Sequence, residues 1–303
     1  MLSSRKSNKE IVAAIIELRK QYNFKLCDML DVAKISKSVY HYWKVNLKIV
    51  KQKDNTILEL IKDIIKVHKG RVGYRRVSLE LKRLGHKINH KKVLRIMREH
   101  KLLCVKFKHR NRSYKSYKGQ VGKVAKNKLN RRFISDRPYQ KLLTDVTQFS
   151  IQNGSIKLYL SPILDVYSKE IISYSISKRP TLDFVLKSME EAITCIPKLS
   201  YRTIIHTDQG WHYQNKNWIK KIRNHKIIQS MSRKGNCLDN SPMENFFGLL
   251  KQEMFYGVNF KSYEELENEI KDYINYYNHI RRKENLKGKT PVEYRNLALE
   301  RVA

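Results

Sequence analysis

The sequence predicts a two-part protein in which an all-helical front half precedes a mixed α/β domain. The charge is divided in a similar way: residues 1–137 hold 38 Lys and Arg against 10 Asp and Glu, whereas residues 138–303 hold 25 against 18. The apolar spacing changes near Pro138 from helical to strand-like. The formal net charge of +35 indicates a polyanionic partner, with nucleic acid favoured over a membrane surface. We therefore expect the front half to bind the polyanion.

The composition is that of a folded protein, with 41% hydrophobic and 30% charged residues. The four cysteines are scattered without a Cys-x-x-Cys pair, which favours a reduced, cytoplasmic protein over a disulfide framework. The apolar run near the N-terminus, residues 11–16, is too short for a signal peptide or a membrane span. We therefore expect a cytoplasmic protein without a membrane partner.

The front half has the pattern of two similar helical units. Residues 8–44 have the spacing of three short helices, of which the last begins after Ser36 as a candidate N-cap and is basic and aromatic. The same layout recurs over residues 56–103. Short three-helix units with a basic last helix are typical of the helix-turn-helix. We predict one helix-turn-helix domain in residues 1–50 and a second in residues 51–103.

The second of these units carries candidate DNA contacts. Its basic side chains contrast with a buried apolar face, and a DNA-binding surface is favoured over a merely solvated one. The candidates are Arg75, Arg76, Lys91, Lys92 and Arg95. The spacing of nearby ligand types raises a zinc site as an alternative, although the apolar face accounts for the helices without a metal. The zinc ligands would be His86, His90, His100 and Cys104.

Residues 104–137 form a basic segment with a single acid, Asp136, and no persistent helical or strand period. We expect this segment to be a flexible linker. It is also suited to follow DNA phosphates as a basic arm, with Tyr114 and Tyr117 available for stacking.

Residues 138–303 have the pattern of three consecutive strands followed by alternating helices and strands. An Asn153-Gly154 turn joins the first two strands as a hairpin. The fourth strand, in RTIIHTDQG, and the fifth, in IIQSMS, each follow a helix, and further helices come after them. This order predicts a mixed five-stranded sheet with flanking helices, as found in α/β ribonuclease-H-like folds.

Three acids in this half stand out from their surroundings. Asp145 interrupts an apolar strand, where a carboxylate is costly unless it is paired or bound to a metal. Asp208 lies at the carboxyl end of the fourth strand, and Glu244 follows after 35 intervening residues, near the start of a helix. Structural roles remain open: a core acid or loop cap for each aspartate, and a capping box for Glu244, with Ser241 as N-cap and Pro242 at the first helical position.

Several sequence words occur together in order. They are HKGRVGYRRV, TDVTQF, HTDQGWHYQ, SMSRKGNCLDNSPMENFFGLLKQE and YYNHIRRKENLKGKTPVEYR. Over roughly residues 8–296 the chain resembles the second-reading-frame transposase of the IS-three group of bacterial insertion sequences. The spacing of its acids is similar to that of the D,D(35)E catalytic core of retroviral integrases and insertion-sequence transposases.

The resemblance implies a transposase that cleaves DNA at the ends of its element and joins the 3′-hydroxyl to a target strand. Asp145, Asp208 and Glu244 would be its catalytic residues and would hold two divalent ions, Mg²⁺ or Mn²⁺. Lys251, seven residues after Glu244, would lie on the same helical face and contact the DNA end, although an ordinary exposed lysine is the alternative. Further candidates for contacts with phosphates or neighbouring groups are Arg233, Lys234 and Asn240.

The partners implied are DNA, further copies of the chain on that DNA, and a first-frame product of the same element. Because no long leucine heptad run precedes residue 50, we expect either a second-frame product alone or a complete single-frame variant. The alternative function is a catalytically silent DNA-binding regulator. Both functions imply salt-sensitive DNA binding, but only the transposase cleaves and joins strands with Mg²⁺. A simple nuclease is less favoured because it needs no paired helix-turn-helix units.

Overall fold

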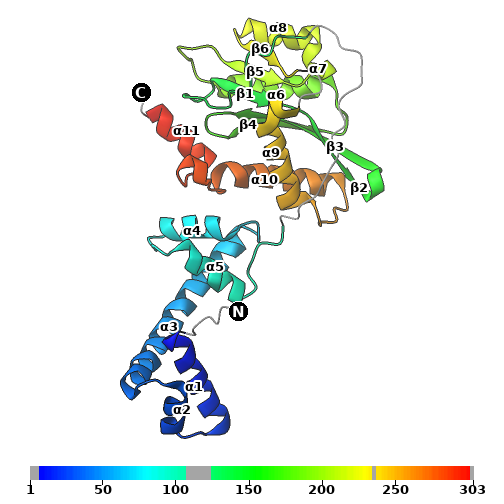
Figure 1. Cartoon of the computed structure of the whole chain (residues 1–303). Coiled ribbons are helices and arrows are strands. Elements are labelled where there is room, and N and C mark those ends of the chain that lie inside the picture. Colours follow the sequence, from blue (N-terminus) through cyan, green and yellow to red (C-terminus); the bar gives the residue numbers. More distant parts are fainter. Residues whose placement is uncertain (1–6, 107–123, 234–236, 301–303) are drawn as a thin grey trace. The chain divides into compact units, whose positions relative to one another are not determined.

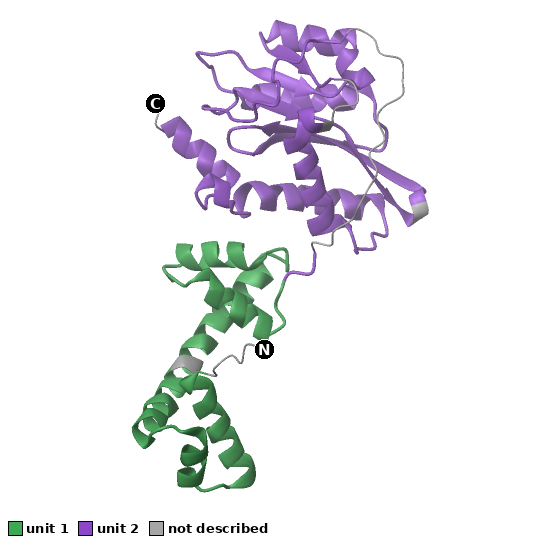
Figure 2. Cartoon of the chain, in the orientation of Figure 1, with its two compact units in different colours: residues 1–103 green, residues 104–303 purple. Residues whose placement is uncertain are grey.

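The computed structural model describes residues 7–106, 124–233 and 237–300, and the chain forms two compact units (Figure 2). The first unit, residues 1–103, is helical, and the second, residues 104–303, combines a sheet with helices.

The first unit encloses two separate apolar clusters. Its helices are α1 (Asn8–Tyr22), α2 (Leu26–Ala33), α3 (Lys37–Val67), α4 (Tyr74–Arg83) and α5 (His90–Glu99). Val12 and Tyr40 are buried in a cluster formed by α1, α2 and the first part of α3. Ile61 and Val93 are buried in a cluster formed by the last part of α3 with α4 and α5. Each predicted helix-turn-helix region therefore has its own core.

The helix α3 corrects the expectation that residues 36–44 and 56–70 form separate helices. It begins after Ser36, whose hydroxyl accepts a hydrogen bond from the Val39 amide at 3.3 Å, as predicted for an N-cap. Residues 45–55 contain neither Gly nor Pro, so no helix-breaking residue ends the helix between the two regions. The two regions predicted to be helix-turn-helix units therefore share one helix, which Figure 1 shows as a long rod.

The second unit is built on a mixed sheet. Its strands are β1 (Lys141–Thr144), β2 (Thr147–Ile151), β3 (Ile156–Asp165), β4 (Ile171–Ser177), β5 (Ile204–Thr207) and β6 (Ile228–Met231). β1 is antiparallel to β3 and parallel to β5, β5 is parallel to β6, and β4 pairs with β3. β1 and β2 are one strand with an interruption at Asp145, because the pairs Thr144–Ile163 and Thr147–Leu160 lie in the same register. The predicted mixed five-stranded sheet is confirmed, with its first strand broken at Asp145.

The turn between β2 and β3 confirms the predicted hairpin. It contains the short 3-10 helix η1 (Gln152–Gly154), and Gly154 has a φ of 94°, in the region that favours glycine. The antiparallel pairing of β2 with β3 follows directly from this turn.

Helices cover both faces of the sheet. They are α6 (Leu182–Cys195), α7 (Trp211–Gln214), α8 (Lys216–Asn224), α9 (Ser241–Leu250), α10 (Tyr263–His279) and α11 (Pro291–Glu300). Neighbouring strand residues point to opposite faces: Leu143 joins the core formed with α9 and α10, whereas Leu142 joins the core formed with α6 and α8. Figure 1 shows α8 and α10 on opposite sides of the sheet. The flanking helices predicted for this half are therefore confirmed.

Short irregular turns complete the second unit. The 3-10 turns η2 (Cys237–Asn240) and η4 (Glu284–Leu286) precede α9 and α11, and the π-helical turn η3 (Lys251–Phe255) follows α9. Within the described ranges, no helix combines the length and apolar character that a membrane crossing requires.

Candidate active site

Asp145 lies at the break between β1 and β2. Its Oδ1 accepts a hydrogen bond from the amide of the next residue, Val146, at 2.7 Å. Thr144 before it is fully buried, and Asp145 itself is half-buried. The interruption of strand pairing therefore accommodates an acid in the middle of an apolar strand that would otherwise disfavour it.

Asp208 follows β5, the neighbour of β1 in the sheet. The two strands are parallel with Leu143 opposite His206, and each aspartate comes two residues after this pair. The carboxyl ends of both strands therefore present an acid at one edge of the sheet. Asp208 Oδ1 accepts a hydrogen bond from the Gly210 amide at 2.9 Å, and a Cβ at Gly210 would lie 2.9 Å from the same oxygen. A larger residue at position 210 would therefore displace the Asp208 carboxylate from this position.

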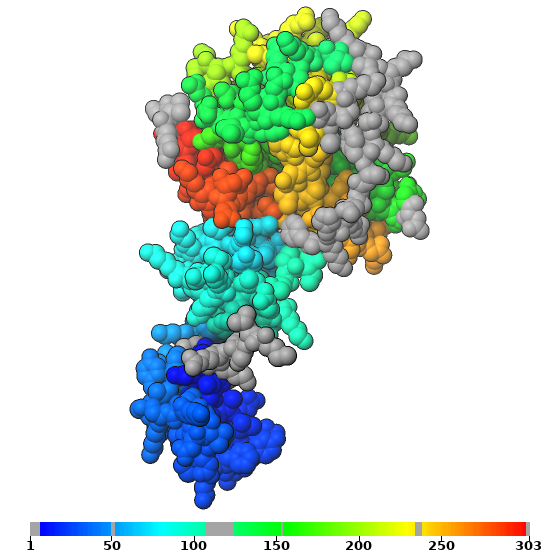
Figure 3. Space-filling model, in the orientation of Figure 1, coloured from blue at the N-terminus to red at the C-terminus, as the bar shows by residue number. Residues whose placement is uncertain are grey.

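Glu244 lies in the first turn of α9, and its side chain is exposed. Figure 3 shows the yellow to orange surface of α9 open on the face in view. α9 begins at Ser241 with Asn240 as its N-cap residue, and no side chain caps this helix end. The capping-box alternative for Glu244 is therefore wrong, because Ser241 is already the first residue of α9 and Pro242 the second. The Glu244 carboxylate instead sits at the positive end of the helix without a role in capping.

The carboxylates of Asp208 and Glu244 both act on Asp145. Burial raises the pKa of Asp145 well above its usual value, and the carboxylates of Asp208 and Glu244 raise it further, while Lys251 lowers it. Burial also raises the pKa of Asp208 and of Glu244. Burial raises the pKa of the nearby Tyr213 hydroxyl, and both aspartates add to that increase. Like charges placed close enough to shift each other's pKa are typical of functional sites.

The chemistry of these donors suits a hard divalent cation. Asp145 and Asp208 each use one oxygen for a local backbone amide, and carboxylate oxygens are preferred ligands of Mg²⁺. In the ranges that the structure covers, no three His, Cys, Asp or Glu side chains already surround one point as metal ligands do. Mutual repulsion of carboxylates opposes such convergence, and the exposed Glu244 side chain has other rotamers available. The donor set therefore fits a hard cation by its chemistry, and binding one would require the three carboxylates to converge.

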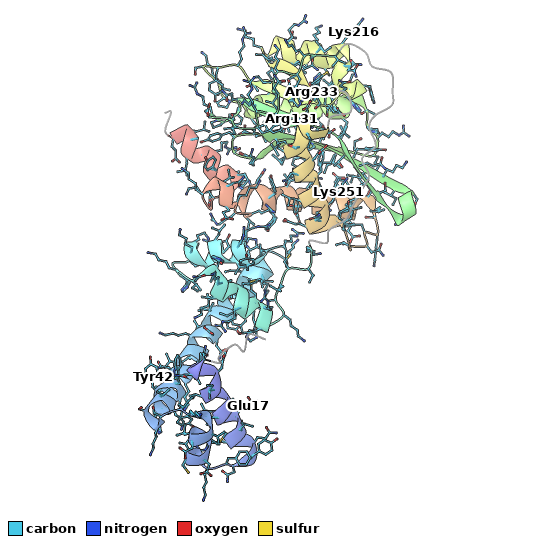
Figure 4. All side chains as sticks on the ribbon, in the orientation of Figure 1. Glu17, Tyr42, Arg131, Lys216, Arg233 and Lys251 are labelled. Carbon is cyan, nitrogen blue, oxygen red and sulfur yellow. The ribbon has the colours of Figure 1, made fainter. Side chains whose placement is uncertain are left out.

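Lys251 begins the π-helical turn η3, seven residues after Glu244. Its Nζ lies 5.2 Å from the centre of the Phe149 ring of β2, and its charge lowers the pKa of Asp145. Figure 4 shows Lys251 at the opposite end of α9 from Arg233. Lys251 therefore lies within electrostatic range of Asp145, and π-helical turns are frequent at functional sites.

The other predicted contacts near α9 have different surroundings. Arg233 binds the buried carboxylate of Asp239, with Nη2 donating to Oδ1 at 2.8 Å. Asn240 is buried, and its side-chain amide has no hydrogen-bond partner in the described part of the chain, so the structure gives it no contact that matches the predicted role. Lys234 lies outside the described residues, as do the two tyrosines predicted to stack on bases, Tyr114 and Tyr117.

The candidate DNA contacts on α5 are partly engaged within the protein. Lys92 Nζ and Arg95 Nη2 bind Asp54 of α3 at 2.7 and 2.6 Å, and Arg95 also binds Glu99 at 2.9 Å. Lys91 is exposed. Lys92 and Arg95 therefore attach α5 to α3, in addition to any contact with DNA.

The candidates on α4 differ in exposure. Arg75 is exposed, and its Nε donates to the Tyr74 hydroxyl at 3.3 Å. Arg76 is half-buried, and its Nη1 donates to the Arg71 carbonyl at 3.1 Å. The side chains proposed as zinc ligands also form no metal-binding group of three among the described residues. These side chains are His86, His90, His100 and Cys104.

Sequence reasoning did not single out Asp239 or Arg131. Asp239 is fully buried, and hydrogen bonds from Arg233 and Arg131 hold the pKa of its carboxyl far below the usual range. The signal available in the sequence was an Asp before Asn240 in a polar loop, a pattern equally typical of an ordinary turn.

The chain matches two families of known domains. Residues 135–237 and residues 244–299 match the integrase core domain, and residues 52–111 match an HTH-like domain. All three candidate acids fall within the two integrase segments.

Full-length relatives match most of the chain. It is 43% identical over 282 residues to the putative transposase InsK for insertion sequence element IS150 of Escherichia coli K12, with 92% of this chain and 96% of that protein covered. It is 46% identical over 213 residues to an uncharacterized transposase-like protein of Haemophilus influenzae, with 70% and 95% covered. Among solved structures, the HTLV-2 integrase catalytic core domain in complex with magnesium matches 54% of this chain and 99% of that one, at 20% identity and a TM-score of 0.42.

Proposed function

The chain belongs to the IS-three group of bacterial insertion-sequence transposases, and on that premise we propose that it cleaves DNA at the ends of its element and joins the 3′-hydroxyl to target DNA. Asp145, Asp208 and Glu244 are the proposed catalytic residues. The observation that supports this choice is that the adjacent parallel strands β1 and β5 end in Asp145 and Asp208 at the same level of the sheet. The carboxylates of Asp208 and of Glu244, from the separate helix α9, both raise the pKa of Asp145.

The same three residues are the proposed metal ligands. When bound, two Mg²⁺ or Mn²⁺ ions activate a water or a 3′-hydroxyl and neutralise the leaving oxygen in an in-line displacement at phosphorus. The proposal is supported by the parallel strands β1 and β5, whose carboxyl ends carry Asp145 and Asp208, and by Glu244 in the first turn of α9. Since the attacking group is water or DNA, no side chain has to act as a nucleophile. Lys251 is proposed to bind a phosphate of the DNA end.

DNA recognition is proposed for the first unit, with boundaries at residues 1–50, 51–103 and 104–137 for two helix-turn-helix regions and a basic linker, followed by the catalytic core in 138–303. The proposed contacts are Arg75, Arg76, Lys91, Lys92 and Arg95, with Arg233 and Lys234 in the core. We expect more than one copy on the DNA, since two ends of one element have to be processed. A first-frame product of the element is a proposed further partner.

The test is substitution of each acid by its amide. Asp145→Asn, Asp208→Asn and Glu244→Gln should each abolish Mg²⁺-dependent cleavage and strand transfer, because the amide loses the charge that binds the cation. DNA binding, measured by fluorescence anisotropy, should remain.

Asp183→Asn is the matched control. It removes an exposed acid from the first turn of α6, as Glu244→Gln does from α9, and should leave activity unchanged. A variant that keeps normal activity would remove that acid from the site. A wild-type chain that binds DNA but never cleaves it with Mg²⁺ would favour the silent regulator instead.

A further inference from the structure

The carboxylate of Asp239, five residues before Glu244, is fully buried and heavily bonded. Arg233 donates to it from its backbone amide at 3.0 Å, from Nε at 2.9 Å and from Nη2 at 2.8 Å. Arg131 Nε donates to Oδ1 at 2.9 Å, and Asn127 Nδ2 donates to Oδ2 at 3.0 Å. We call this set the Asp239 clasp, and Figure 4 shows Arg131 and Arg233 close together near the beginning of α9. Hydrogen bonds between two charged groups are stronger than those between neutral groups.

Two donors of the clasp come from residues 124–133, a segment distant in sequence that lies along β6. The amides of Lys128 and Leu129 both donate to Ser230 Oγ, at 2.9 and 3.3 Å. Leu129 is buried in the core beneath α9. The end of the predicted linker is therefore anchored to the second unit through its backbone as well as through Arg131.

The same hydrogen bonds reach the strand that carries Asp208. Ser230 Oγ lies 2.8 Å from His206 Nδ1, and Ser232 Oγ lies 3.0 Å from His206 Nε2. Gln209 Nε2 donates to the Ser232 carbonyl at 3.0 Å. Because His206 and Gln209 flank Asp208 in sequence, the end of β5 is linked to the clasp through Ser230 and the backbone of residues 127–131.

The beginning of α9 depends on the loop before it for its direction. Its N-terminus has no side-chain cap, and its N-cap residue Asn240 forms no side-chain hydrogen bond in the described ranges. Met243 and Phe246 are buried against the sheet, but apolar packing is not directional, whereas hydrogen bonds fix both distance and angle. Among the described residues of that loop, Asp239 is one that hydrogen bonds hold firmly.

We propose that Asp239, held by Arg131 and Arg233, is a positioning residue that fixes the first turn of α9 and so sets where Glu244 lies relative to Asp145 and Asp208. The inference rests on the proposed function, because it concerns the geometry of the same three acids. It assigns to the end of the basic linker a part in assembling the active site, beyond any contact with DNA.

The test compares Arg131→Ala with Arg132→Ala in the full-length chain. Both remove one exposed positive charge from the same segment, but the Arg132 side chain has no hydrogen bond or ion pair in the described part of the chain. Backbone amides of residues 238–247 should exchange hydrogen faster in Arg131→Ala than in Arg132→Ala. The Mg²⁺ concentration for half-maximal cleavage should rise by about tenfold in Arg131→Ala, as expected when a residue that orients a metal ligand is lost.

Affinity for DNA should be the same in both variants, because the charge removed is the same. Arg131→Lys, which keeps the charge without the guanidinium geometry, should give an intermediate Mg²⁺ requirement. Equal exchange rates and equal Mg²⁺ requirements in the two alanine variants would overturn the inference and leave the proposed function intact. A lower thermal midpoint in Arg131→Ala without a change in Mg²⁺ requirement would also overturn it. If the wild type does not cleave DNA, the proposed function fails, and hydrogen exchange still decides whether the clasp fixes α9.

Discussion

Asp145 and Asp208 each accept a hydrogen bond from a backbone amide in their own loop, from Val146 at 2.7 Å and from Gly210 at 2.9 Å. Such a bond favours the charged carboxylate, whereas burial disfavours it. Burial has the larger effect here, since the pKa of both aspartates is raised. Each aspartate is therefore held in position by a backbone amide, but this bond does not fully offset the cost of burying its negative charge. A bound cation would offset that cost.

His206 gives the stability of the protein a predicted dependence on pH. Its ring is fully buried, and burial lowers its pKa to about 4, with Asp239 opposing part of that shift. Unfolding exposes the imidazole, which then takes up a proton near its usual pKa of about 6.5. Between these two values the unfolded state binds more protons, so the free energy of unfolding falls as the pH falls from about 6.5 to about 4.

Urea unfolding at pH 7 and pH 5 checks this prediction. The wild type should lose about 2 kcal/mol through His206 over this interval, and His206→Gln, which does not titrate, should lose less. Glu170 acts in the opposite sense: burial raises its pKa to about 7, against the effect of Arg295, so its contribution is lost as the pH rises toward 7. Comparing the chain with and without His206→Gln in a Glu170→Gln background therefore isolates the effect of His206 on stability. Equal losses in the wild type and in His206→Gln would contradict the assignment.

At the element scale, the π-helical turn η3 joins α9 to the rest of the core through an ion pair. Glu253 of this turn is fully buried, and Arg281, after α10, binds it with Nε at 3.1 and 3.0 Å and with Nη2 at 2.7 Å. The Tyr273 hydroxyl donates to the same carboxylate at 3.0 Å. Since α9 carries Glu244, the pair also supports the far end of the helix that presents this candidate acid.

Arg281→Met should destabilise the protein by about 3–5 kcal/mol, because it leaves the buried Glu253 charge unpaired. The double variant Glu253→Gln/Arg281→Met should recover part of that loss, since neither charge then remains. Lys271→Met is the control: it breaks the ion pair of the solvent-exposed Lys271 with Glu267 on α10 and should cost far less than Arg281→Met. Denaturant unfolding measures all three. A loss in Arg281→Met no larger than in Lys271→Met would show that the buried pair does not support the fold.

At the scale of the whole molecule, both compact units are cationic. Residues 1–103 hold 26 Lys and Arg against 9 Asp and Glu, and residues 104–303 hold 37 against 19. The basic linker belongs to the second unit, and its last part is bound to β6. Both units are therefore expected to contribute to DNA binding, rather than the first alone.

Binding of the full-length chain to DNA should weaken steeply with salt between about 50 and 200 mM, because each phosphate contact releases a counterion. The fragments 1–103 and 104–303 should each fold and bind with a smaller salt slope than the whole chain. A fragment that ends at residue 50 should be less stable than fragment 1–103, because it cuts α3. Fluorescence anisotropy gives the slopes, and circular dichroism reports folding. A full-length slope no steeper than that of fragment 1–103 would confine DNA binding to the first unit.

How far the sequence could predict the site depends on the distance between interacting residues. Ser36 as N-cap, the hairpin at Gly154 and the order of strands follow from local periodicity and turn chemistry, and the structure confirms them. The start of α9 was predicted one residue late, because Ser, Asn and Pro all favour helix starts and local preference does not decide between them.

Local patterns along the chain are enough to predict the helical front half and the mixed sheet, because each leaves a signal within a few residues. The spacing and surroundings of Asp145, Asp208 and Glu244 mark these three residues as candidate acids. Only the tertiary structure decided that α3 is continuous, that Lys92 and Arg95 share Asp54, and that a linker residue binds Asp239. Arg131 and Asp239 are 108 residues apart in sequence. Their pairing is set by how the linker lies along β6, which depends on burial and hydrogen bonds across the whole unit and leaves no local pattern.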